Sequence, residues 1–258
     1  MQLHILASGS TGNAVLIEMG GKRLLIDAGI SARRIERGLA GVGIAVEKLD
    51  GILITHEHSD HIKGMEVLLK RYRLPVYARP ATWEAMPARD RIPPECQRYL
   101  GDSLDLGAVK IVPFAISHDA VEPVGFCFYY QNTKWVLATD LGVVTRSVAE
   151  ALAYADVAIL ESNHDIEMLK NGPYPPFLKQ RIKGQQGHLS NYDAGQILAR
   201  IPRQAIMQVF LAHLSQKNNR PSLAERTVSQ VLQSSGCQVG EEIVLHQTYP
   251  DGTASLVC

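Results

Sequence analysis

A layered α/β fold is predicted for this chain of 258 residues. Three observations predict it. Short apolar β-like runs alternate with amphipathic helical stretches in both halves of the sequence, a pattern typical of sheets covered by helices. No low-complexity linker separates the halves. Hydrophobic residues make up 46% and charged residues 20% of the chain, which allows a sizeable core. We therefore expect one domain over 1–258, with two similar halves of about 1–133 and 134–258.

The first half is dominated by short strands, and glycine-rich turns separate the first three. The predicted strands are Gln2–Ala7, Ala14–Glu18, Lys22–Ile26, Gly51–Thr55, Val76–Ala78, Val109–Ala115 and Gly125–Tyr130. A helix is expected at Ser31–Leu39. A second helix is expected from His61 to about Tyr72, where apolar residues recur at three- and four-residue steps.

The second half alternates strands with helices. The predicted strands are Trp135–Ala138, Ala155–Glu161 and Ala205–Leu211, and the predicted helices are Ser147–Tyr154, Asn191–Ile201 and Leu223–Ser234. The proline-rich stretch Met168–Gly187 has no periodicity and is expected to be irregular. It forms either a solvated loop or a basic arm that contacts phosphates.

Charge and cysteine content limit the possible partners. Lys+Arg and Asp+Glu number 26 each, so no global field attracts nucleic acid or a membrane, and a polyanion would need local positive charge or metal ions. The four cysteines show no CxxC pairing, which favours a reducing cytoplasm. No signal peptide or spanning stretch is evident. We expect a soluble, cytoplasmic protein without a membrane partner.

The segment His56-Glu-His58-Ser-Asp60-His61 carries the strongest functional signal. Four potential metal ligands fall within six residues, directly after an apolar strand. A turn at a strand end lets such closely spaced side chains converge on one point. Imidazole and carboxylate together suit Zn²⁺, Mn²⁺ or Fe²⁺. Three of the nine histidines of the chain lie here, so a chance surface turn is a poor alternative.

Three further ligand candidates each follow an apolar strand. They are His118, Asp140 and His213. Singly, each could be a capping or turn residue. Together with the histidine-rich segment they provide ligands for two metal ions, at one edge of a sheet.

This order of ligands resembles the metallo-β-lactamase superfamily over essentially the whole chain. The resemblance implies an αββα four-layer sandwich and two divalent ions, Zn²⁺ or Mn²⁺. It implies that one metal is bound by His56, His58 and His118, and the other by Asp60, His61 and His213. Asp140 would bridge the two ions, and Asp27 would be a structural acid near the metal loop.

Three further motifs resemble those of the WalJ/YycJ-type group, small members associated with 5′→3′ exonuclease activity on DNA. They are Ser8–Asn13, Glu161–Asp165 and Gly187–Asn191. The order of the last two motifs, followed by Leu-Ala-His213-Leu-Ser, also resembles ribonuclease Z. In those enzymes the histidine of the middle motif, here Gly-His-Leu-Ser, contacts the scissile phosphate. His188 is its counterpart here. The chain lacks room for the inserted domain of the β-CASP nucleases between Asp140 and His213.

Several residues are expected to act on the substrate. Asp60, Asp140 and His188 are the candidate catalytic residues. The candidate substrate-binding residues are Ser10, Asn13, Asn163, His164, His188, Lys179 and Arg181, with Lys170 and Lys183 on the same basic arm. For Ser10 and Asn13 the alternative is a plain tight turn between strands, and Asn163 and His164 could simply stabilise a turn.

The expected activity is hydrolysis of DNA phosphodiesters by metal-activated water. Two alternatives share the metal ligands: a thioester hydrolase of the glyoxalase II type, and an RNA-processing nuclease of the ribonuclease Z type. A third is a metal-stabilised binding module without catalysis. The complete ligand set argues against that module, and the Glu161–Asp165 and Gly187–Asn191 motifs favour a phosphodiester substrate.

Overall fold

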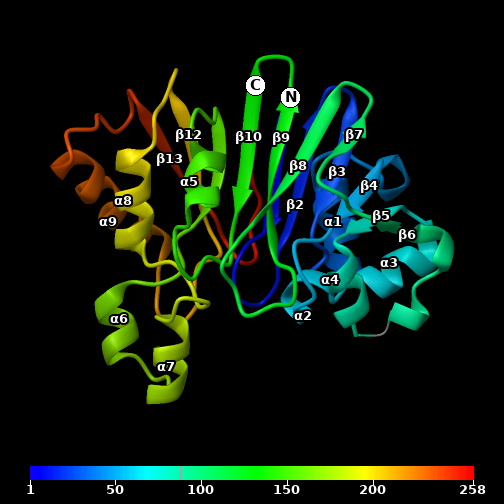
Figure 1. Ribbon diagram of the computed structural model, residues 1–258, viewed down its shortest axis with the longest axis horizontal. Coiled ribbons are helices and arrows are strands. Elements are labelled where there is room, and N and C mark those ends of the chain that lie inside the picture. The colour runs from blue at the N-terminus through cyan, green and yellow to red at the C-terminus, as the bar shows by residue number, and fades with distance from the viewer. Residues whose placement is uncertain (88) are drawn as a thin grey trace. The chain divides into compact units, whose positions relative to one another are not determined.

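The chain forms two seven-stranded sheets with accompanying helices (Figure 1). The structure is a computed structural model that describes residues 1–87 and 89–258. The chain divides into two compact units. Unit 1 comprises 1–112, 120–124 and 250–258, and unit 2 comprises 113–119 and 125–249. The expected organisation as a single domain of two halves stays a prediction.

The sheet of unit 1 has the strand order β14-β1-β2-β3-β4-β5-β6. Strands β14 to β3 are antiparallel neighbours, whereas β3 to β6 run parallel. The strands are β1 (Gln2–Ala7), β2 (Ala14–Met19), β3 (Lys22–Ile26), β4 (Gly51–Leu53), β5 (Val76–Ala78), β6 (Gln97–Tyr99) and β14 (Ala254–Val257). The two edge strands, β6 and β14, were not expected from the sequence, since neither is an apolar run.

The longer helices of unit 1 bury apolar side chains in the core. They are α1 (Ala32–Gly41), α2 (Ser59–Ile62), α3 (Met65–Tyr72) and α4 (Pro80–Ala85), with short 3₁₀ helices at Val46–Lys48, Arg89–Arg91 and Pro94–Cys96. In α1, the Ser31 hydroxyl caps the N-terminus, and Ile35 and Leu39 are fully buried. Each such side chain contributes about 1.5–3 kcal/mol of hydrophobic stabilisation.

The helix expected from His61 to Tyr72 is in fact two helices, α2 and α3. Gly64 separates them, because its N–H donates to the carbonyl of Ala28 instead of bonding within a helix. A Cβ on Gly64 would come within 2.2 Å of the Ile30 oxygen. The periodic pattern predicted the buried face correctly but could not reveal this close backbone contact.

The strands of unit 2 lie in the order β13-β12-β11-β10-β9-β8. They are β8 (Val109–Ala115), β9 (Val124–Tyr130), β10 (Thr133–Ala138), β11 (Val157–Glu161), β12 (Met207–Ala212) and β13 (Ile243–Gln247). Strands β10 to β13 are parallel, and β9 is antiparallel to β10. Strand β8 begins in unit 1, where it pairs with β7 (Leu104–Leu106). The carboxyl ends of β10, β11 and β12 therefore lie at one edge of the sheet.

Five helices connect the strands of unit 2. They are α5 (Arg146–Leu152), α6 (Ile166–Asn171), α7 (Pro176–Ile182), α8 (Asn191–Arg200) and α9 (Pro221–Ser234). The expectation of irregular structure over Met168–Gly187 was wrong, because most of that stretch lies in α6 and α7. Pro176 opens α7, where a helix needs no backbone N–H.

The longest described helix, α9, has 14 residues, and none in the described part of the chain could span a bilayer.

Candidate metal centre and its surroundings

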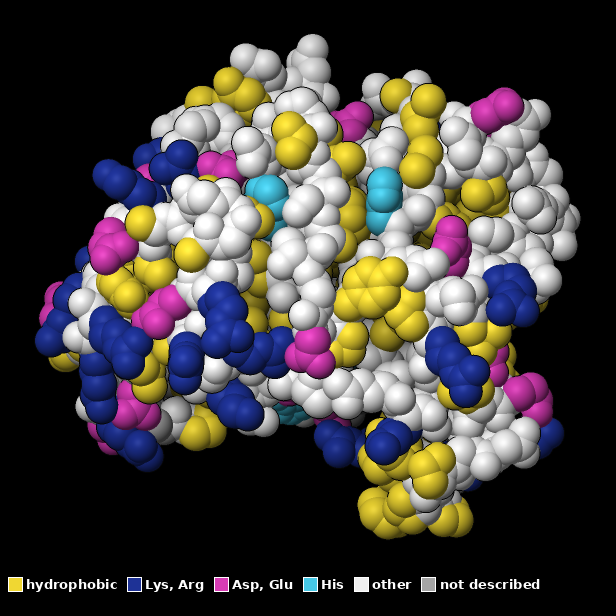
Figure 2. Space-filling model, turned by 180° about the vertical axis from the view of Figure 1, so that it is seen from behind, with side chains coloured by type: hydrophobic (Ala, Val, Ile, Leu, Met, Phe, Trp, Pro, Cys, Tyr) yellow, Lys and Arg dark blue, Asp and Glu magenta, His cyan; other side chains and the backbone are white. Residues whose placement is uncertain are grey.

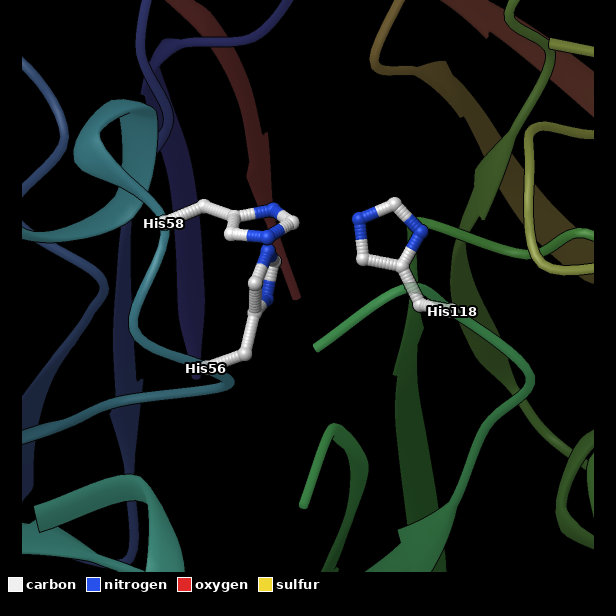
Figure 3. Close-up of side chains that lie close together, drawn as sticks. All are labelled: His56, His58 and His118. Atoms are coloured by element: carbon white, nitrogen blue, oxygen red, sulfur yellow. The ribbon is translucent and has the colours of Figure 1, made fainter. Parts of the chain in front are cut away.

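The histidine-rich turn of unit 1 lies between β4 and α2. Ile52, Leu53 and Ile54 before it are fully buried, which fixes the base of the turn in the core. The rings of His56 and His58 meet edge to face with their centroids 4.6 Å apart (Figure 3). The centroid of the His61 ring lies 4.0 Å from that of His56. The three imidazoles of the predicted ligand motif are therefore clustered.

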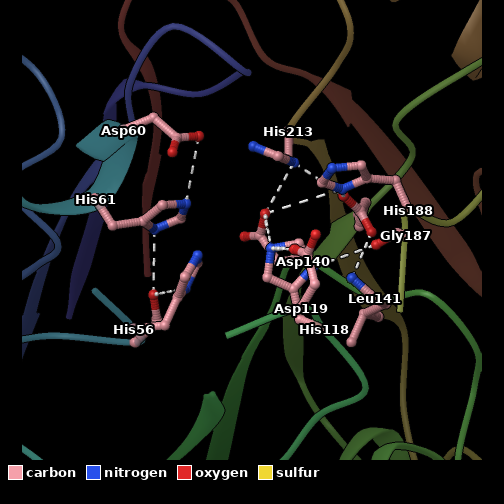
Figure 4. Close-up of polar contacts among 12 residues, drawn as sticks. His56, Asp60, His61, His118, Asp119, Asp140, Leu141, Gly187, His188 and His213 are labelled. Atoms are coloured by element: carbon pink, nitrogen blue, oxygen red, sulfur yellow. Dashed lines mark hydrogen bonds and ion pairs between the residues drawn. The ribbon is translucent and has the colours of Figure 1, made fainter. Parts of the chain in front are cut away.

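Asp27 orients His61. It follows β3 with a φ of 60°, and its carboxylate accepts hydrogen bonds from the Thr55 N–H (2.9 Å) and from Nδ1 of His61 (2.7 Å). Because Nδ1 donates, the lone pair of His61 lies on Nε2, the atom that would coordinate a metal. Asp60 Oδ2 lies 3.6 Å from this Nε2 (Figure 4). Asp60 and His61, two expected ligands of one ion, are thus adjacent.

The Ser8–Asn13 turn is packed against the same residues. The buried Asn13 side chain accepts from the Gly9 N–H (3.0 Å) and lies 3.2 Å from His61 Nε2. The Asn13 N–H donates to the Asp60 carbonyl at 2.9 Å. Asn13 thus supports the histidine-rich turn, whereas Ser10 is exposed to solvent.

The strand ends of unit 2 bring three predicted ligands together. Asp140 Oδ1 lies 3.5 Å from His213 Nδ1 and 3.8 Å from His118 Nε2 (Figure 4). Asp140 and His213 follow the parallel strands β10 and β12, and both have a left-handed backbone, with φ of 62° and 55°. Non-glycine residues rarely adopt this conformation, and it is concentrated at functional sites.

Glu161, the last residue of β11, is a site residue that the expected set omitted. It is fully buried, and its Oε1 accepts from Nδ1 of His188 (2.8 Å) and of His213 (2.9 Å). Its Oε2 accepts from the backbone N–H of Leu141 (2.6 Å) and Leu189 (3.0 Å). Burial alone would raise the pKa of this carboxyl, but His188 and His213 outweigh burial and lower it. One ionised carboxylate therefore orients both imidazoles.

Both imidazoles consequently donate through Nδ1 and carry their reactive nitrogen at Nε2. The His188 side chain is 22% exposed, whereas that of His213 is 2% exposed. His188 is therefore the member of this pair whose side chain is accessible from solvent, whereas the side chain of His213 is enclosed.

A backbone carbonyl, and not a carboxylate, orients His118. Its Nδ1 donates to the Gly187 carbonyl at 3.3 Å. Burial lowers the pKa of His118, so the imidazole is neutral at neutral pH despite the nearby Asp140 carboxylate. A neutral imidazole is the form that binds a metal.

A cavity of about 520 Å³ lies between the residues on either side of His118 and the loop that precedes Gly187. Its lining residues are Ser117, Asp119, Arg181, Gly184, Gln185 and Gln186. The Arg181 Nε donates to Asp119 at 2.7 Å, and the Ser117 hydroxyl donates to the Gln185 carbonyl at 2.6 Å. Arg181, expected to contact substrate, is therefore also part of an internal ion pair.

Asn163 and His164, also expected to contact substrate, are each only 3% exposed. The Asn163 amide donates to the His213 carbonyl at 2.9 Å, which supports the loop that carries His213. Burial lowers the pKa of His164 to about 4, so its ring is uncharged. Both side chains lie within the protein core beside Glu161.

The basic arm is defined as residues 166–187, which contain α6 and α7. Lys179 Nζ donates to the Lys170 carbonyl at 2.8 Å, linking the two helices. The Lys170 and Lys183 side chains are exposed. In sequence the arm lies between Glu161 and His188, and the His188 N–H donates to the carbonyl of Ile182 at the end of α7.

Comparisons with known proteins agree with this architecture. The family model described as the beta-lactamase superfamily domain matches residues 22–214. The chain is 42% identical over 255 residues to exodeoxyribonuclease YycJ of Bacillus anthracis, with 97% of each chain covered. It is 39% identical over 265 residues to exodeoxyribonuclease WalJ of Streptococcus pneumoniae, with 98% of this chain and 96% of the relative covered. The metallo-β-lactamase fold protein YhfI from Bacillus subtilis superimposes with a TM-score of 0.72 at 16% identity, covering 98% of each chain.

This protein belongs to the metallo-β-lactamase superfamily and is a hydrolase. The fold class predicted from the sequence is confirmed, as is the resemblance to the WalJ/YycJ-type group. The fold implies use of divalent metal, and the histidine and aspartate clusters described above supply suitable donors.

Proposed function

We propose that this hydrolase is a dinuclear metal-dependent phosphodiesterase that degrades DNA as a 5′→3′ exonuclease. Two relatives of nearly equal length are named exodeoxyribonucleases, which supports a nucleic acid substrate. The observation that carries the proposal is the hydrogen bond by which buried Glu161 orients His188 beside Asp140.

The proposed metal ligands are those expected from the sequence. His56, His58 and His118 would hold one ion, Asp60, His61 and His213 the other, and Asp140 both. The donor chemistry fits, because Nδ1 of His61, His118 and His213 each meets an oxygen acceptor, which leaves the lone pair on Nε2. When bound, such ions lower the pKa of coordinated water and polarise phosphoryl oxygens.

His188 is proposed to donate a proton to the leaving oxygen of the cleaved phosphodiester. Its Nδ1 is bonded to Glu161, so the proton would leave from Nε2, and the carboxylate would stabilise the cationic ring. A sugar alkoxide is strongly basic and needs this proton. A thiolate leaving group needs no proton, because the pKa of a simple thiol is only about 8.5. A positioned acid therefore favours phosphodiester over thioester hydrolysis.

The remaining chemistry is assigned to residues around the ions. Asp60 would accept a hydrogen bond from the attacking water, and Asp140 would help to hold both ions next to it. Ser10, at the exposed tip of its turn, would contact a phosphate oxygen. Asn13, Asn163 and His164 would act by holding these groups in place.

A direct assay tests the proposal. The purified enzyme is incubated with Mn²⁺ or Zn²⁺ and with 5′- or 3′-labelled single- and double-stranded DNA, RNA, or a glutathione thioester. We expect stepwise release of nucleotides from the 5′ end of DNA. Faster turnover of RNA would indicate an RNA-processing nuclease, and turnover of the thioester alone would refute phosphodiester hydrolysis.

We expect two metal ions per chain after loading with Mn²⁺ or Zn²⁺. Seven ligands are available, whereas one tetrahedral site takes four at most. Elemental analysis after gel filtration gives the stoichiometry, and the His56→Ala variant should retain one ion. A parent enzyme that never exceeds one tight ion contradicts the dinuclear site.

The exposed lysines of the basic arm should bind phosphates. Replacing Lys170 and Lys183 by serine should reduce the slope of log K against log salt by about 0.7–0.9 for each phosphate that is no longer neutralised. Arg181 is kept, because it pairs with Asp119. The measurement is DNA affinity between low and moderate salt, with Lys110→Ser as a control outside the arm. An unchanged slope would place the nucleic-acid surface elsewhere.

A further inference from the structure

The basic arm carries an exposed aromatic ring. Phe177, in the first turn of α7, is 73% exposed, more than any other large hydrophobic side chain identified as exposed in the described residues. Pro173, Pro175 and Pro176 beside it in sequence are exposed as well. Helices α6 and α7 lie at the lower left of Figure 1, and the tip of the arm, at the lower right of Figure 2, is covered by hydrophobic side chains next to Lys and Arg. The free energy is lowered when a partner covers an apolar ring that is exposed to water.

The ring stands on a firmly attached helix. Lys179 ties α7 to α6 through the Lys170 carbonyl, and Arg181 ties α7 to Asp119. At the end of α7, the buried Ile182 accepts a hydrogen bond from the His188 N–H at 2.8 Å. Phe177 therefore stands at the start of a helix whose other end is hydrogen-bonded to the backbone of His188.

The charge around the ring indicates which partner covers it. Residues 166–187 contain four cations, Lys170, Lys179, Arg181 and Lys183, and one acid, Glu167, which gives 4 − 1 = +3. The whole chain has a net charge of zero. Like charge disfavours pairing of this arm with the same arm of a second copy. Lysines interleaved with an exposed aromatic ring instead match a single-stranded nucleic acid, whose bases stack while its phosphates meet cations.

We propose that Phe177 stacks on an unpaired base of the bound strand. The inference rests on the proposed nuclease function and specifies its substrate: a polynucleotide with an unpaired base at the arm, in a single strand or a frayed duplex end. Stacking on an aromatic side chain tolerates any base, so this contact adds affinity without sequence preference.

The test compares Phe177→Leu, which keeps apolar bulk but removes the π-face, with Phe177→Trp, which keeps it. Phe177→Leu should raise KM for a single-stranded oligonucleotide by about 5- to 150-fold, the range for one stacked base. Phe177→Trp should match the parent. The matched control is Tyr99→Leu, which removes an exposed ring from β6 of unit 1 and should have no effect. Hydrolysis of bis(p-nitrophenyl) phosphate should be equal in all four proteins.

Abasic substitution then identifies the stacked base. An abasic nucleotide placed at successive positions should raise KM of the parent at one position only, and Phe177→Leu should be insensitive at that position. If the parent cleaves DNA but Phe177→Leu has the parental KM, the stacking is overturned while the nuclease function stands. If sedimentation shows that Phe177→Leu dissociates a dimer, the surface is a subunit interface and the inference is wrong. If no polynucleotide is cleaved, both proposals fail.

Discussion

The Asp140→Asn variant is expected to lose at least about 10³-fold in phosphodiester turnover, because charge stabilisation by bound metal is worth several kcal/mol. Asn is the informative replacement, because Asp140 has a φ of 62° and Asn tolerates this left-handed conformation better than most residues. The variant keeps the shape of the side chain and removes the charge that would be shared by both ions. We therefore expect bound metal to fall from two ions to one or none, with the fold intact.

The matched comparison is His213→Ala, which removes a ligand of one ion only. It should retain one ion and lose less activity than Asp140→Asn. Elemental analysis, circular dichroism and single-turnover cleavage of a labelled oligonucleotide provide the three measurements. If Asp140→Asn binds two ions and turns over normally, Asp140 does not bridge the metals.

The sequence was most informative where ligands are dense. The segment from His56 to His61 could be recognised because so many donors at short spacing after an apolar strand are rare unless they bind metal. His118, Asp140 and His213 were identified by their positions at strand ends, and the structure brings them together at one edge of the sheet of unit 2. The rule that parallel strands end at the same edge accounts for Asp140 and His213. The assignment of the whole set as ligands also drew on the family resemblance.

Glu161 was not predicted as a site residue, because its role arises from partners distant in sequence. Its four hydrogen bonds reach from Leu141, 20 positions before it, to His213, 52 positions after it. A glutamate at the end of an apolar strand is equally compatible with a simple turn. Its function becomes evident only from the fold, which buries the carboxylate and places two imidazoles against it.

Similar reasons account for the other differences. Asn13 was expected to hold a phosphate, which stays a prediction. The structure adds that its amide lies beside His61, because its turn folds back onto the histidine-rich turn. The prolines of the basic arm suggested irregular structure, but Pro175 and Pro176 occur where a helix starts. Sequence pattern indicates which residue types lie near a turn. It does not indicate which neighbouring segment they contact.

Replacing His188 by alanine should lower phosphodiester turnover by ~10²–10⁴-fold while both metal ions and the fold are retained. The loss should be smaller for bis(p-nitrophenyl) phosphate, because p-nitrophenolate is a good leaving group and needs no proton. Equal losses for DNA and for this compound would indicate that His188 binds the phosphate and does not act as the acid.

The Glu161→Gln variant distinguishes the contributions of the two imidazoles that this carboxylate orients. The neutral amide would replace the charge that supports both Nδ1–H groups, at 2.8 Å from His188 and 2.9 Å from His213. Loss of such a carboxylate partner of a metal ligand costs about 10–100-fold in metal affinity or activity. Glu161→Gln should therefore weaken one metal ion, as seen by chelator competition, whereas His188→Ala should not. At saturating metal, Glu161→Gln should add little to the loss caused by His188→Ala, because Glu161 acts on proton transfer only through that ring. Full additivity of the two losses would show that Glu161 contributes to turnover by a route independent of His188.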